Sequence, residues 1–176
     1  LVIFASQDYV AKFPRFQGEY YALVLLSVVG MMLMAATREL ISIYISLELT
    51  SLSLYALVSF LKDPKSTEAS LKYLILGAIA SAVLLYGMAL VFGLTGQTHL
   101  AGIYASVRNM PLADNPALIL GLVFLVAGFG FKIASVPFQM WVPDVYEGAP
   151  TTVTAYLSVA SKAAGFAVIL RVVLEA

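Results

Sequence analysis

The sequence predicts an all-α integral membrane protein, and three observations indicate that fold class. Hydrophobic residues make up 61% of the 176 residues and charged residues only 11%, and the mean hydropathy is +0.95, which is more apolar than a soluble domain. Apolar stretches of about 20 residues, the length that crosses a bilayer, recur along the chain. No strand-like alternation competes with them, and a helix satisfies its own backbone hydrogen bonds in lipid. We therefore expect one bundle of transmembrane helices.

Five apolar stretches are long enough to form these helices. They cover residues 20–37, 40–61, 68–95, 117–142 and 151–174. Charged or proline-containing turns separate them, and the longest gap, residues 96–115, is expected to form a surface loop or a short interfacial helix. Residues 1–19 form a polar approach segment, and residues 20–176 form one five-helix unit. The chain starts at Leu1 without a signal-peptide pattern, so we expect a fragment of a longer protein.

Small residues and prolines predict how these helices pack. Small side chains that would let neighbouring helices approach closely occur at Gly77, Ala80, Ser81, Gly87, Gly121, Gly128 and Gly130. Pro137 removes a backbone donor inside the fourth predicted helix, so we expect that helix to be kinked or discontinuous. Trp141 is typical of an anchor at the membrane interface. Pro143 and Pro150 bound the turn that follows.

The distribution of basic residues predicts the orientation of the bundle. With five helices, the approach segment, the loop after residue 61 and the loop after residue 142 lie on one side of the membrane. That side carries Lys12, Arg15, Lys62, Lys65 and Lys72, whereas the other side carries Arg38 and Arg108, with Arg171 near the end of the fifth helix. Because basic residues are more frequent in cytoplasmic loops, we expect the first side to be cytoplasmic.

Three ionisable residues fall well inside the predicted helices. At 1.5 Å per residue, Glu48 lies about 12 Å and Lys162 about 16 Å from the starts of their helices, and Lys132 lies about 14 Å from Trp141. A charge at such depth costs about 2.5–3.5 kcal/mol on insertion scales. Glu48, Lys132 and Lys162 should therefore face one another or water.

Three interpretations are open for these charges. A lysine near a helix end can extend its ammonium to the interface, which fits Lys72, in the first turns of its helix, better than Lys132 or Lys162. A buried ion pair can simply hold a bundle together. The third interpretation is an ion or proton path, in which a buried amine and a carboxylate titrate as a coupled pair. The depth of the charges favours the third.

Other classes of function lack their sequence signatures. The chain has no cysteine and a single histidine, His99, in a polar turn, so no disulfide or metal is expected, and its scattered charges give no nucleic-acid-binding face. The motifs of serine hydrolases, zinc proteases and phosphate-binding loops are absent. Asp144 and Glu147 are interpreted as solvated or helix-capping residues. Most of five tyrosines are interpreted as packing or interface aromatics, although they could hydrogen-bond water: Tyr44, Tyr55, Tyr73, Tyr86 and Tyr156.

Four segments resemble the antiporter-like membrane subunits of respiratory complex I, the NADH–quinone oxidoreductase, and most of all its subunit N group. They are SLELTSLSLYALVSF (46–60), STEASLKYLILGAIASAVLLYGMALVFGLTG (66–96), GFGFKIASVPFQMWVPDVYEGAP (128–150) and SVASKAAGF (158–166). The resemblance extends over residues 17–176. It implies that the five helices are one half of an inverted-repeat, antiporter-like fold.

The resemblance also implies roles for four residues. In that family, the matching glutamate on the second helix of a repeat and the matching lysine on the discontinuous fourth helix form the charge pair that drives proton movement. These roles pass to Glu48 and Lys132, and Lys162 matches the central relay lysine. Lys72 matches a family lysine whose role is less defined. Because family members carry two repeats, a single repeat should not pump alone.

The same resemblance also implies a cellular location and partner subunits. It implies a multi-pass subunit of the bacterial inner (plasma) membrane that moves protons, coupled to electron transfer from NADH to quinone in other subunits. NADH, flavin, iron–sulfur clusters and quinone are expected in those partner subunits, with no cofactor, metal or nucleic acid bound by this chain. Mrp-type cation/proton antiporters and membrane-bound hydrogenases share the glutamate and lysine pattern and remain alternatives. A non-pumping scaffold is a further alternative.

Overall fold

The computed structural model describes residues 2–11, 15–108, 110–111 and 114–175. Within them, five helical spans are long and apolar enough to cross a membrane: α3 (Gln17–Ala36), α4 (Leu40–Val58), α5 (Pro64–Thr95), α7 (Pro116–Ile133) and the final span Thr151–Glu175. The final span consists of α9 (Thr151–Tyr156), a π-helical turn (Leu157–Ser161) and α10 (Lys162–Glu175). The all-α membrane fold class and the five-helix bundle are therefore confirmed.

Four short helices complete the described chain. They are α1 (Val2–Ala5), α2 (Gln7–Val10), α6 (Leu100–Val107) and α8 (Val142–Gly148). Helix α6 occupies the long gap for which the sequence allowed a loop or a short helix. Lys12, which contributes to the predicted charge asymmetry, lies outside the described residues.

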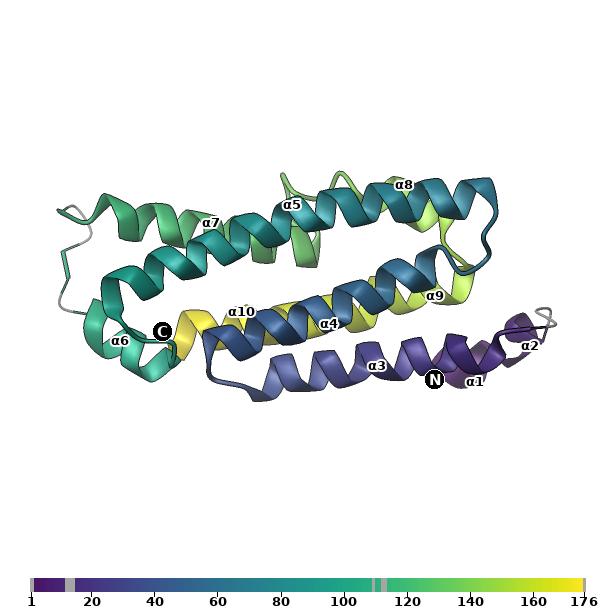
Figure 1. Cartoon of the computed structure of the whole chain (residues 1–176), viewed down its shortest axis with the longest axis horizontal. Coiled ribbons are helices and arrows are strands. Elements are labelled where there is room, and N and C mark those ends of the chain that lie inside the picture. Colours follow the sequence, from purple (N-terminus) through teal and green to yellow (C-terminus); the bar gives the residue numbers. More distant parts are fainter. Residues whose placement is uncertain (1, 12–14, 109, 112–113, 176) are drawn as a thin grey trace.

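The long helices run along the long axis of the molecule (Figure 1). Helices α5, α7 and α8 make the upper layer, α4 and the α9–α10 span make the layer below it, and α3 lies at the bottom. Helix α4 packs against α3 and α5, and α5 packs against α7 and α8. Helix α10 contacts both α7 and α3. The face between the layers is therefore built mainly by α4, α5, α7 and α10.

Among the helix starts, that of α5 differs most from its predicted boundary, and capping explains the difference. The carboxylate of Asp63 accepts a hydrogen bond of 2.7 Å from the backbone N–H of Ser66, and Pro64 occupies the first turn of α5. Both features are typical of a helix N-terminus. Residues 64–67, which precede the predicted helix 68–95, therefore belong to α5, with Asp63 as its N-cap. Helix α4 ends earlier than predicted, at Val58.

Glycines bring α5 and α7 into close contact. A Cβ atom added to Gly87 would lie 2.9 Å from the carbonyl oxygen of Gly121, and one added to Gly121 would lie 3.3 Å from the carbonyl oxygen of Gly87. Side chains would therefore hold these backbones apart, as expected for small residues between membrane helices. The predicted packing role is confirmed for this pair.

The apolar core is divided into two clusters with a polar layer between them. One cluster includes Leu54 of α4, Tyr73 of α5 and Trp141. The other includes Leu47 of α4, Leu84 of α5 and Phe129 of α7. The residues that lie between the clusters along these segments are considered next: Glu48, Ser51, Gly77, Ser81 and Lys132.

Candidate functional site

One face of α4 carries most of the polar layer. Tyr44, Glu48, Ser51 and Tyr55 follow one another at intervals of four, three and four residues, which places them on the same side of an α-helix. Ser51 is buried and the other three are half-buried. This face looks toward α5 and α7, because Glu48, Ser51 and Tyr55 line one cavity with Ser81 and Lys132.

Lys132 is the buried cation of this site. It lies in the last turn of α7, and only 6% of its surface is exposed. Its Nζ donates a hydrogen bond of 2.8 Å to the Oγ of Ser51. The Ser51 hydroxyl gives its own proton to the carbonyl of Leu47, at 2.6 Å. Ser51 is therefore an acceptor for Lys132, and the ammonium has a partner inside the bundle.

The break in α7 gives Lys132 a second source of stabilisation. The helix ends at Ile133, and Ala134 adopts a left-handed conformation with φ of 57°. The last carbonyls of a helix carry a partial negative charge that stabilises a cation in the final turn. Lys132 occupies that turn. The discontinuous fourth helix is thus confirmed, and its end lies at the level of the lysine.

The chain after the break folds back against the end of α7. The backbone N–H of Ser135 donates to the carbonyl of Gly130 at 2.9 Å, and Nε1 of Trp141 donates to the carbonyl of Phe131 at 3.0 Å. Both carbonyls lie in the last turn of α7, where they also accept from the backbone N–H of Ala134. Residues 134–141 are therefore held by the bundle, and Pro137, in a cis peptide with Val136, lies within them.

Trp141 corrects one expectation from the sequence. It was expected at the membrane interface, but only 2% of its surface is exposed. Its indole stacks on Tyr73, with ring centroids 4.6 Å apart and an interplanar angle of 12°. Because the chain folds back after α7, the indole packs in the core beside the helix end that carries Lys132 instead of marking a boundary.

Glu48 lies in the same cavity but does not pair directly with Lys132. Its carboxylate hydrogen-bonds the Ser81 hydroxyl, and that hydroxyl also lies 3.0 Å from the Tyr44 hydroxyl. Among the described residues, no ion pair joins Glu48 to Lys132. The cavity that both line has a volume of about 10 Å³, at the lower limit for one water molecule. The structure therefore brings the two charges to one small polar space.

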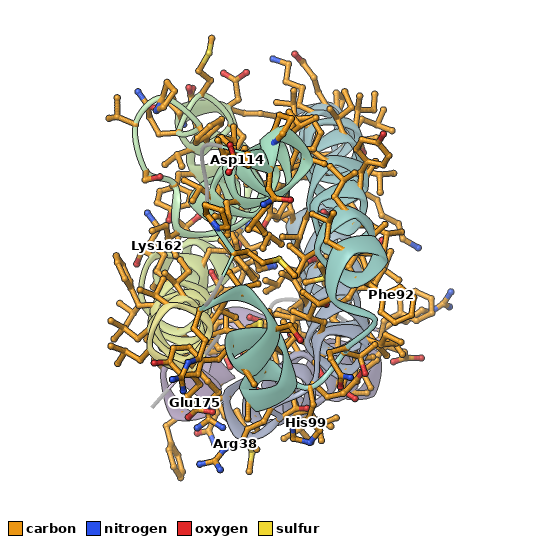
Figure 2. The ribbon with its side chains drawn as sticks, turned by 90° about the vertical axis from the view of Figure 1, so that its left-hand side faces the viewer. Arg38, Phe92, His99, Asp114, Lys162 and Glu175 are labelled. Carbon is orange, nitrogen blue, oxygen red and sulfur yellow. The ribbon has the colours of Figure 1, made fainter. Side chains whose placement is uncertain are left out.

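Lys162 lies outside the lining of that cavity. It is the first residue of α10, directly after the π-helical turn, and its Nζ lies 5.5 Å from the ring centroid of Tyr146, within cation–π range. Figure 2 places it at the edge of the bundle, between the ribbons of α7 and α10. One turn along α10, a Cβ added to Gly165 would lie 3.7 Å from Cγ of Lys132. The helix of Lys162 thus packs against the stem of Lys132.

Lys72 makes ion pairs instead of extending alone to the interface. Its Nζ lies 2.9 Å from Glu68 Oε1 and 2.9 Å from Asp144 Oδ2. Glu147 pairs in the same way with Lys65, at 2.8 Å. Asp144 and Glu147 are exposed, as expected, but they are also ion-paired. Together the two pairs tie α8 to α5.

Three further members of the site were not assigned to it from the sequence. Ser51 was not singled out, Ser81 was read as a packing residue, and Tyr44 was grouped with packing aromatics. The heptad-like spacing of Tyr44, Glu48 and Ser51 was available in the sequence and places them on one helix face. Ser81 gives no such signal, because its role depends on how α5 packs against α4.

Comparisons with known proteins place these features in a family context. The family model described as NADH:quinone oxidoreductase/Mrp antiporter, transmembrane, matches residues 37–176. The NADH-quinone oxidoreductase subunit N of Dehalococcoides mccartyi is 55% identical over 175 residues, which cover 97% of this chain and 36% of that protein. Subunit N 2 of Rhizobium meliloti is 55% identical over 176 residues, which cover 99% of this chain and 36% of that protein. The chain therefore spans about a third of the length of these curated relatives.

Solved structures show the same fold. A chain of respiratory complex I from Thermus thermophilus matches with a TM-score of 0.77 and 44% identity, over 89% of this chain and 34% of that chain. A chain of the Mrp complex from Dietzia sp. matches with a TM-score of 0.75 and 24% identity, over 85% of this chain and 28% of that chain. At 24% identity the second match supports the fold alone.

Proposed function

Because the chain belongs to the NADH:quinone oxidoreductase/Mrp antiporter family, we propose that it is a proton-translocating repeat of an NADH–quinone oxidoreductase subunit N. One observation carries the proposal: Lys132 is buried at the break of α7 and faces a cavity that Glu48 also lines. A buried amine and carboxylate persist in a membrane helix bundle at a cost in stability, and such groups usually mark ion or proton paths.

Lys132 is the proton carrier in this proposal, and Glu48 modulates it. Burial disfavours the ammonium form, whereas Ser51, the end of α7 and an ionised Glu48 favour it. No direct ion pair joins the two side chains in the described structure. A small movement of Glu48, or a change in its charge, therefore alters how strongly Lys132 holds its proton.

Lys162 is the proposed next station, and Lys72 has a positioning role. The stem of Lys132 lies beside Gly165, one turn from Lys162 on α10, so a proton leaving Lys132 along this side passes toward α10. Lys72 binds Asp144 on α8, and α8 follows the segment that folds back after Lys132. The ion pair thus helps to fix the segment that surrounds the carrier.

Electron transfer belongs to partner subunits in this proposal. The chain has no cysteine to hold an iron–sulfur cluster, and we infer that NADH, flavin, iron–sulfur clusters and quinone bind elsewhere in the complex. The matched structures are chains of multi-subunit membrane complexes, which supports other membrane subunits as partners. This chain would contribute to the enzyme by moving protons, without a redox centre of its own.

We further propose that residues 20–176 form one repeat and that the remainder of the protein supplies the second. The relatives are about three times as long as this chain, which leaves room for a second set of helices and the other half-channel. The location would be the bacterial inner (plasma) membrane, with the approach segment and the α4–α5 loop in the cytoplasm. Arg15, Lys62 and Lys65 support that orientation.

The direct test replaces Lys132 by Met in the full-length protein in its native membranes. NADH-driven acidification of inverted vesicles, measured by quenching of a pH-sensitive dye, should fall by about tenfold or more, because a positioned proton-transfer group typically contributes a hundredfold or more. NADH oxidation with an artificial acceptor and the amount of assembled complex should stay near normal. Lys65→Met, which removes a surface ion pair outside the cavity, is the matched control and should pump normally.

The alternatives predict different results. Unchanged acidification in Lys132→Met would refute the assignment of the carrier. Under the scaffold hypothesis, Glu48→Gln would also pump fully. A Mrp-type antiporter would instead move protons in exchange for sodium without any electron donor, and the family description, which also names the Mrp antiporter, is the observation that keeps this second candidate.

A further inference from the structure

The hydrogen bonds of Ser81 define the direction in which a proton can pass between its neighbours. Its hydroxyl is bonded to the carboxylate of Glu48 and lies 3.0 Å from the hydroxyl of Tyr44. A serine hydroxyl has one proton to donate and can accept as well. The geometry makes Ser81 the donor to Tyr44, so a protonated Glu48 donates to Ser81 and Ser81 donates to Tyr44. The three groups then form a chain of donors that runs from Glu48 through Ser81 to Tyr44.

Ser81 differs from the other serines on the neighbouring helix. Ser46, Ser51 and Ser53 each donate to the carbonyl four residues earlier in α4, the usual bond of a serine inside a helix. Among the described residues, Ser81 makes no such bond to its own helix, and its hydroxyl contacts only the side chains of Glu48 and Tyr44. The proton of Ser81 is thus available for exchange.

The chain leads from the site toward one end of the bundle. Tyr44 lies four residues before Glu48 on α4, about 6 Å nearer to the Arg38 end. Tyr44 also lines a second cavity of about 180 Å³, whose other lining residues are apolar except for Thr98. Phe92, one of these apolar residues, lies at the outer edge of the bundle (Figure 2). Lys132 lies on the opposite side of Glu48, bound to Ser51, three residues further along α4. Glu48 therefore lies between the Ser81–Tyr44 hydrogen bond, toward the Arg38 end, and the Lys132–Ser51 hydrogen bond on its other side.

We propose that Ser81 and Tyr44 form a two-hydroxyl relay that carries protons between Glu48 and water at the Arg38 end of the bundle. Protonated Glu48 gives its proton to the oxygen of Ser81, the original Ser81 proton passes to Tyr44, and the original Tyr44 proton passes to a water molecule. The carboxylic acid becomes a carboxylate, the water becomes a hydronium ion, and neither hydroxyl changes its charge. The same steps in reverse load Glu48. This inference rests on the proposed proton-translocating function and adds the residues that exchange protons with Glu48.

The test uses the full-length protein in its native membranes. Ser81→Ala and Tyr44→Phe each remove one hydroxyl of the relay. NADH-driven acidification should fall by about tenfold in both variants, while NADH oxidation with an artificial acceptor is retained. Ser81→Thr, which keeps a hydroxyl, should restore most of the acidification. Two matched controls make the same chemical changes outside the relay: Ser46→Ala, whose hydroxyl bonds only its own helix, and Tyr86→Phe, whose ring packs on Phe124.

A second readout separates proton transfer from structural damage. The carboxylic C=O band of Glu48, assigned by its loss in Glu48→Gln, should shift in infrared spectra of Ser81→Ala, because the hydrogen-bond partner of the carboxyl group is gone. Acidification in Ser81→Ala and Tyr44→Phe equal to that in the controls, or an unshifted band, would overturn the relay. Lys132→Met distinguishes the two proposals: if it pumps normally, the proposed function fails, whereas if only the relay variants pump normally, the relay alone fails.

Discussion

Gly77 shows how a single residue shapes the site. A Cβ atom added there would lie 2.8 Å from Cζ of Tyr55 and closer still to its hydroxyl. The missing side chain on α5 therefore leaves the space that the tyrosine of α4 occupies beside the cavity. The sequence suggested a packing role for Gly77, and the structure shows that it makes room for a polar side chain of the candidate site.

Replacing Gly77 by Ala should displace the Tyr55 hydroxyl. Overpacking of this kind costs about 1–3 kcal/mol, so the melting temperature of the full-length protein in lipid nanodiscs should fall. Gly93→Ala on the same helix, where nothing lies within 4 Å of an added Cβ, is the control and should be neutral or up to about 1 kcal/mol more stable. Equal melting temperatures for the two variants would show that the close packing of Tyr55 on Gly77 does not contribute to stability.

Charged residues of the site could be predicted from the sequence, and the role of Ser81 could not. Glu48, Lys132 and Lys162 stand out in a chain of 11% charged residues, because a charge far from a helix end is costly. Serine is common in membrane helices and usually bonds its own backbone, as Ser46 does. Sequence alone does not reveal that Ser81 instead meets Glu48, since that contact requires the packing of α5 on α4.

At the scale of elements, the end of α7 is the decisive feature. Pro137 indicated a discontinuity, but the helix ends earlier, at Ile133. The sequence could not give the path of residues 134–141, because that path depends on contacts with other helices, such as the stack of Trp141 on Tyr73. The preference of tryptophan for interfaces therefore misled the assignment of Trp141.

Close packing and surface ion pairs both hold α8 against α5, and their contributions differ. A Cβ added to Gly148 would lie 2.9 Å from the carbonyl oxygen of Lys65 and closer to the Cβ of Ala69. The Lys65–Glu147 pair is exposed, and such pairs contribute about 0–1 kcal/mol. The close packing of Gly148 against α5 therefore contributes more to the position of α8 than the exposed ion pairs do.

For the whole molecule, the predicted sidedness can be tested with single cysteines. The chain has none of its own, and Lys62 and Asp114 are both exposed, in the α4–α5 and α6–α7 connections. In the full-length protein, a membrane-impermeant thiol reagent should label Lys62→Cys only from the cytoplasmic side and Asp114→Cys only from the other. Labelling of both from one side would contradict the membrane crossings, whereas exchanged sides would contradict only the orientation.

The central claim is that Glu48 and Lys132 act as one proton-exchanging pair, and a double-variant cycle tests it most directly. NADH-driven acidification is measured for Glu48→Gln, Lys132→Arg and the double variant in the same membranes, at equal amounts of complex. If the two side chains act together, the double variant should lose much less than the product of the two single losses. Losses that multiply would mean that the residues act independently, and would contradict the shared site.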